Sequence, residues 1–130
     1  MMRGRCRTAL GAAVALGLLA LGPVAARADG YFGAISVSPG SGATGWGYDF
    51  DSSDDAAEAA MRNCSRYAQD CRLAAVFSNG CGAVAANADV YVGDSSPSKE
   101  DAMRAAMVRC LIRGGGCSIV RWVCTTNSRW

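Results

Sequence analysis

The chain has 130 residues, of which 13 are Lys or Arg and 11 are Asp or Glu, and it contains no histidine. Without an imidazole base, Ser-His-Asp and Cys-His nucleophile systems are excluded. The formal net charge of +2 is small. It does not indicate nucleic-acid binding, which requires a basic stripe on the folded domain.

Residues 1–28 have the pattern of a removable secretory signal peptide. Three arginines within the first seven residues precede an apolar run from Ala9 to Val24, and residues 26–28 (Ala-Arg-Ala) match a small-x-small cleavage site. The run is shorter than the roughly 20 residues that span a bilayer, which favours cleavage after Ala28 over an uncleaved anchor. We therefore expect a secreted protein with no membrane span after cleavage.

Residues 29–130 are expected to form a single mature domain. Losing the leader removes four arginines, so Lys plus Arg falls from 13 to 9 and the net charge changes from +2 to −2. The basic balance of the precursor therefore belongs to its leader, and no nucleic-acid partner is expected. A domain of this size buries a modest core, so covalent cross-links would add usefully to its stability.

Six cysteines remain in the mature part, and an even number in an exported chain predicts a disulfide framework. A zinc site is the alternative, but the sequence has no C-x2-C pair and no histidine. A redox-active pair is a second alternative, which the absence of C-x-x-C disfavours. We expect no metal and no cofactor.

The mature sequence repeats itself, in units of about residues 31–79 and 80–124. Residues 32–35 match 81–84, residues 52–64 match 98–110 without a gap, and residues 71–78 match 117–124. Each unit reads as strand, loop or strand, helix, strand. Ser52 and Ser98 are predicted helix N-caps, each followed by a stripe of alanine, methionine and cysteine at helical spacing.

The strands are predicted from β-rich runs at 32–38, about 45–50, 73–78, 81–86, 90–92 and 119–124. Together these elements predict an α+β fold. The expected form is a two-layer sandwich built from two β-(β)-α-β pseudo-repeats, with one sheet of about six strands, both helices on one face and disulfide staples. An Asn79-Gly80 turn signal suggests a hairpin between the units.

The repeat narrows the fifteen possible cysteine pairings. Each predicted helix ends in a cysteine and the following strand begins with one, so equivalent pairs are the simplest assignment. The remaining two cysteines are Cys81 and Cys124, and the first unit has Phe32 and Ser78 at the matching positions. Both cysteines are therefore absent together from the first unit, as expected if they bond to each other. The predicted bridges are Cys64–Cys71, Cys110–Cys117 and Cys81–Cys124.

An acidic run at residues 49–55 has three interpretations. It lacks the glycine and glutamate of a calcium-binding EF-hand loop, and helix capping explains Asp54 and Asp55 more simply. Carboxylate chemistry at Asp49 and Asp51 is kept as an alternative. No catalytic residue is assigned.

Trp122 is expected in the core and Lys99 on the exposed surface. The predicted contact surface combines aromatic and acidic side chains. Its residues are Trp46, Tyr48, Asp49, Asp51, Tyr91 and Asp94.

Several motifs together resemble the secreted bacterial family called domain of unknown function 4189. They are the twice-used (F/C)-G-A-(I/V) strand, the Gly-Trp-Gly-Tyr segment at 45–48, the alanine-rich helices ending in cysteine, and the closing Val-Arg-Trp-Val-Cys at 120–124. The resemblance extends from about Tyr31 to Cys124. It implies a small exported domain with no assigned enzymatic activity, and it transfers no catalytic residue.

We expect a non-catalytic secreted binding or effector domain, monomeric, acting on a protein partner at the envelope, in the medium or in a host. The alternative is a secreted hydrolase or an enzyme inhibitor that uses the carboxylates near Asp49 and Asp51.

Overall fold

The computed structural model describes residues 30–128, so the signal peptide predicted for residues 1–28 lies outside the described residues. The described chain contains six strands and two helices, and both halves have the same order of elements. These are β1 (Phe32–Val37), β2 (Thr44–Phe50), α1 (Ser53–Ser65), β3 (Arg72–Ser78), β4 (Cys81–Ala86), β5 (Tyr91–Ser96), α2 (Lys99–Ile112) and β6 (Ser118–Cys124).

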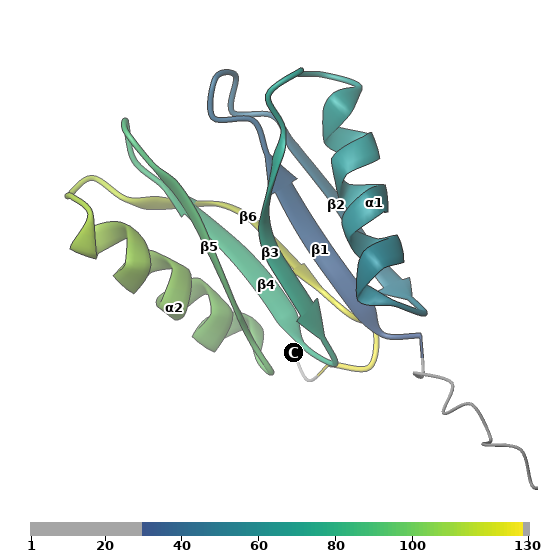
Figure 1. Cartoon of the computed structure of the whole chain (residues 1–130). Helices are drawn as coiled ribbons and strands as arrows, with labels where there is room; N and C mark the ends of the chain where they lie inside the picture. Colours follow the sequence, from purple (N-terminus) through teal and green to yellow (C-terminus); the bar gives the residue numbers. More distant parts are fainter. Residues whose placement is uncertain (1–29, 129–130) are drawn as a thin grey trace, which may run out of the picture.

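The strands form two antiparallel sheets of three strands each, in the orders β2-β1-β3 and β5-β4-β6. The sheets lie face to face, with α1 outside the first sheet and α2 outside the second (Figure 1). The α+β class is thus confirmed. The predicted single sheet with both helices on one face is wrong, because the layers are helix, sheet, sheet, helix.

The central strands explain this arrangement. β1 and β4 are buried along almost their whole length, on both faces. In a single sheet with both helices on one face, side chains such as Ile35 and Val84 would point into solvent. Instead they lie fully buried between the two sheets. This inter-sheet core contains Ile35, Val37, Ala75, Phe77, Val84 and Val123.

The Asn79-Gly80 turn links the sheets. It was predicted to form a hairpin, but β3 and β4 belong to different sheets and do not pair. Asn79 takes a left-handed conformation with φ 50°, which asparagine tolerates better than most residues. The two-residue link therefore carries the chain from one sheet to the other.

Both predicted helix caps are present. The Ser52 hydroxyl accepts a hydrogen bond from the Asp55 amide at 3.1 Å, and the Ser98 hydroxyl accepts one from the Asp101 amide at 3.3 Å. Each helix packs a stripe of small side chains against its sheet. Of the described helices, none is long and apolar enough to cross a membrane.

All three predicted disulfides are confirmed. Their Cα–Cα distances are 6.1 Å, 6.0 Å and 4.0 Å for Cys64–Cys71, Cys110–Cys117 and Cys81–Cys124. Cys81 pairs directly with Cys124 across β4 and β6, and Phe32 pairs with Ser78 across β1 and β3. The third bridge therefore stands where the first half has an ordinary cross-strand pair.

Candidate functional site

The two sheets are closed on one side and open on the other. On the closed side, β5 passes so near β3 that a Cβ on Gly93 would lie 2.1 Å from the Ala74 carbonyl oxygen. Gly93 and Trp46 occupy equivalent positions in the two halves. Gly93 of β5 pairs with Val84 of β4, and Trp46 of β2 pairs with Ile35 of β1, which matches Val84 in the repeat. A glycine thus allows close approach on one side, whereas a tryptophan occupies the matching position on the other.

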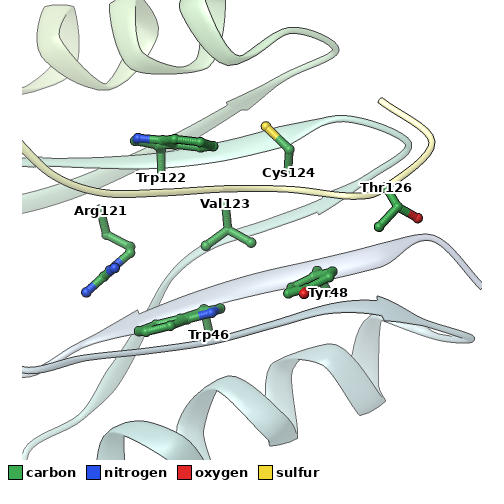
Figure 2. Close-up of a pocket in the computed structure, with 7 residues that line it drawn as sticks. All are labelled: Trp46, Tyr48, Arg121, Trp122, Val123, Cys124 and Thr126. Carbon is green, nitrogen blue, oxygen red and sulfur yellow. The ribbon is translucent and has the colours of Figure 1, made fainter. Parts of the chain in front are cut away.

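The open side forms a groove of about 280 Å³ between β2 and β6. Arg121 and Val123 point from β6 toward Trp46 and Tyr48 of β2, while Trp122 points away, toward α2 (Figure 2). The Trp46 and Tyr48 side chains are 38% and 48% exposed. The residues lining this aromatic groove are Trp46, Tyr48, Arg121, Trp122, Val123, Cys124 and Thr126.

The Gly-Trp-Gly-Tyr segment places both rings in the groove. Successive residues of a strand point to opposite faces, so the two glycines face α1 and the two rings face the second sheet. A Cβ on Gly45 would lie 2.2 Å from the Ala60 carbonyl oxygen, which shows how closely α1 packs. The Trp46 carbonyl accepts a hydrogen bond from the Asn63 amide of α1 at 2.8 Å, which fixes β2 further.

Arg121 joins the two walls of the groove. Its guanidinium lies over the Trp46 ring, 4.2 Å from the centroid, and its Nε donates to the Thr44 hydroxyl at 3.1 Å. Within residues 30–128, no carboxylate lies within ion-pair distance of Arg121. The arrangement holds a positive charge in a fixed orientation beside an aromatic wall.

Asp49 does not line the groove itself, but it binds the lining residue Thr126. Asp49 has φ 61° and lies at the β1–β2 register shift, where the bulge turns Phe50 toward α1. Its carboxylate accepts hydrogen bonds from the Thr126 amide at 3.0 Å and the Thr126 hydroxyl at 2.8 Å. Asp49 therefore ties the end of β2 to the segment that follows β6.

The other predicted contact residues lie elsewhere. Asp51 is exposed after the end of β2 and does not line the groove. Tyr91 and Asp94 belong to β5, at the opposite edge of the second sheet from β6. Tyr91 packs against the inter-sheet core, and the Asp94 carboxylate lies 3.3 Å from the Arg109 Nε. The structure thus brings together Trp46, Tyr48 and Asp49 from the predicted set.

Sequence analysis did not assign four of the lining residues to the contact surface: Arg121, Trp122, Val123 and Thr126. Trp122 was predicted in the core but is 39% exposed, with the Lys99 ammonium 4.5 Å from its ring centroid. Lys99, predicted to be exposed, is half-buried there. The sequence did contain a signal for Arg121. Side chains alternate between the two faces of a strand, so Arg121 of β6 is placed on the face opposite to the disulfide-bonded Cys124.

One carboxyl group in the described chain has a clearly shifted pKa. The hydrogen bonds that Asp70 accepts from the Ser38 hydroxyl and from the Gly40 amide lower the pKa of Asp70 below its ordinary value of 3.8. A general acid would need a shift in the opposite direction. Within residues 30–128, no group of three acidic or cysteine side chains is placed to hold a metal ion.

The comparisons with known proteins agree with the resemblance expected from the motifs. Protein Rv1269c of Mycobacterium tuberculosis and Protein Mb1300c of Mycobacterium bovis are each 35% identical over 99 residues, which cover 76% of this chain and 73% of the relative. The NMR structure of Rv1813c from Mycobacterium tuberculosis is similar with a TM-score of 0.56 at 29% identity, over 73% of this chain and 75% of that one. The model of the family described as "Domain of unknown function (DUF4189)" matches residues 32–124. The chain therefore belongs to the DUF4189 family.

Proposed function

We propose that this chain is a secreted, non-catalytic binding or effector domain that acts on a protein partner through the aromatic groove. The partner would be met at the cell envelope, in the medium or in a host. The same proposal takes the chain to be a monomer and its two halves to be repeats of one unit.

The observation that carries the proposal is the placement of the large rings. The largest fully buried side chains are those of Ile35, Val37 and Val84, and no tyrosine or tryptophan within residues 30–128 is fully buried. Trp46 and Tyr48 instead stand side by side in an open groove. Clustered exposed rings beside an arginine are typical of the residues that supply most of the energy in protein interfaces.

The alternative, a hydrolase or enzyme inhibitor based on Asp49 and Asp51, has less support. Both Asp49 carboxylate oxygens accept hydrogen bonds from Thr126, which gives this group a structural role. Asp51 lies outside the groove. This arrangement favours binding over catalysis.

Export is proposed from the leader pattern of residues 1–28, and three disulfides are compatible with an oxidising compartment. The intact mass of protein recovered from culture medium tests it. A chain beginning at Asp29 is expected, and a recovered chain that keeps Cys6 would contradict the proposal.

The binding function is tested by partner capture with the oxidised protein from medium or host extract. Three forms are compared: the wild type, the double variant Trp46→Ala with Tyr48→Ala, and Ile112→Ala, whose side chain is 79% exposed on α2. A specific partner should be lost with the double variant and kept with Ile112→Ala. Equal capture by all three forms would contradict the proposed site.

A further inference from the structure

We infer that the aromatic groove binds an extended acidic segment of the partner protein, with an Asp or Glu side chain on Arg121 and a large apolar side chain two residues away on Tyr48. This inference rests on the proposed binding function and adds the chemistry of the partner.

The acidic preference follows from Arg121. The guanidinium stacks on Trp46 and its Nε donates to Thr44, so the plane of the group is fixed. Its two Nη groups have no acceptor among residues 30–128 and remain available as donors. Arg121 is the one charged side chain among the groove residues. An arginine whose orientation is already fixed loses little freedom when it binds a carboxylate, and its planar donors match the two carboxylate oxygens.

The extended conformation follows from the spacing of the groove. Trp46 and Tyr48 are two residues apart on one strand, so their rings repeat at about 6.6 Å. A peptide in the extended conformation presents alternate side chains at the same spacing. A carboxylate near Trp46 and Arg121 therefore places the apolar side chain two residues away beside Tyr48.

The peptide is expected on the β6 side of the groove. A helix side chain binds one backbone carbonyl in each of the edge strands β2 and β5. The Asn63 side-chain amide donates to the Trp46 carbonyl of β2, and the Arg109 guanidinium donates to the Gly93 carbonyl of β5 at 3.0 Å. β6 pairs with β4 on one side and borders the groove at residues 121–124, so an added strand would meet β6 there.

A partner segment is favoured over a second copy of this chain. Arg121 is the central residue of β6, Ser118–Cys124. Two copies of β6 aligned antiparallel over their full length would place two Arg121 side chains directly opposite each other. Like charges at such positions are destabilising, whereas an acidic residue there is stabilising.

The test uses fluorescent capped heptapeptide pools and the oxidised protein. One pool has aspartate at position 3 and a mixture of Leu, Phe and Tyr at position 5, with the other positions randomised. A matched pool has asparagine at position 3, and a third moves the apolar residue to position 4. Affinities are measured by fluorescence anisotropy for the wild type, Arg121→Met, Arg121→Lys and Thr44→Val. Arg104→Met removes an exposed charge on α2 and serves as the control.

The wild type should bind the aspartate pool about tenfold more tightly than the asparagine pool, as expected for a hydrogen bond to a charged group. The third pool should bind more weakly than the first. Arg121→Met should lose the aspartate preference and Arg104→Met should keep it. Thr44→Val removes the hydrogen bond that orients Arg121 but keeps its positive charge, so this variant should retain part of the preference for aspartate. Arg121→Lys also keeps a positive charge and should likewise retain part of it.

Equal binding of the aspartate and asparagine pools, or no binding of any pool, would overturn the inference. So would an aspartate preference that survives Arg121→Met. If partner capture still depends on Trp46 and Tyr48 in those cases, the proposed function stands and the acidic peptide is wrong. If capture does not depend on them, the proposed function itself fails.

Discussion

At the scale of single residues, glycines determine where the large aromatic side chains lie. Gly45 and Gly47 lie against α1, and the residues between and after them, Trp46 and Tyr48, are thereby directed into the groove. Gly93 allows the opposite side of the sandwich to close. Gly45, Gly47 and Gly93 therefore shape the groove without lining it.

Gly45→Ala should destabilise the fold. The added Cβ would lie 2.2 Å from the Ala60 carbonyl oxygen and 2.3 Å from the Cys64 amide nitrogen, and both are backbone atoms. We expect a loss of about 2 kcal/mol or more in the free energy of unfolding, typical of overpacking. Urea unfolding followed by tryptophan fluorescence measures it.

Gly115→Ala is the matched control, because a Cβ there would meet nothing within 4 Å. It should leave the free energy of unfolding nearly unchanged. Similar losses in the two variants would contradict the close packing of α1 on β2.

The hydrogen-bonded carboxylate of Asp70 makes the free energy of unfolding depend on pH in the acidic range. Its lowered pKa means that the folded protein holds the charged form more strongly than the unfolded chain does. The stabilisation is present above the ordinary pKa of 3.8 and is lost as the pH falls through the lowered pKa of the folded state. Asp70→Asn should therefore be less stable than the wild type at neutral pH.

The difference in stability between wild type and Asp70→Asn should shrink from about pH 5 to about pH 2. Urea unfolding at a series of pH values gives the comparison. Ser38→Ala removes one of the donors and should reproduce part of the effect. An identical pH dependence in wild type and Asp70→Asn would show that these hydrogen bonds do not stabilise the charged form.

At the scale of elements, the two halves differ in how they fasten equivalent strand pairs. β4 and β6 are joined by Cys81–Cys124, while β1 and β3 place Phe32 opposite Ser78. The first half shows that this strand pair does not require a bridge. The disulfide is therefore expected to add stability rather than to determine the topology.

Replacing Cys81 and Cys124 together with alanine should weaken the fold without abolishing it. The loop-entropy model gives a loss of up to about 4 kcal/mol for this long loop, against about 2.5 kcal/mol for the short loop of Cys110–Cys117. Urea unfolding of the two double variants compares them. A larger loss from removing the short-loop bridge would contradict the expected order.

Much of the element scale was predictable from local signals. Ser52 and Ser98 marked the helix starts, β-rich runs marked all six strands, and equivalent positions in the two halves identified the bridges. β5 was predicted too short, since Gly93 and the Asp and Ser residues after it are weak strand formers. The separation into two sheets was missed, although the apolar character of β1 and β4 on both faces was its signal.

At the scale of the whole molecule, the groove depends on contacts between distant parts of the chain. Thr44 and Arg121 are 77 residues apart in sequence and meet only because the two sheets pack face to face. The prediction grouped aromatic and acidic residues by composition, so it included Tyr91 and Asp94 from the closed side. Local patterns do not determine which edges of two sheets lie open, and Arg121 could not be placed beside Trp46 from sequence.

The most direct test of the central claim is site-specific photo-crosslinking. A benzoylphenylalanine is introduced at Tyr48 in the groove, or at Ile112 on α2 as the control, and the adducts are identified by mass spectrometry. We predict one specific protein adduct from position 48 that is absent at position 112 and is reduced by Arg121→Met. No adduct at position 48, or the same adducts from both positions, would contradict a binding function in the groove.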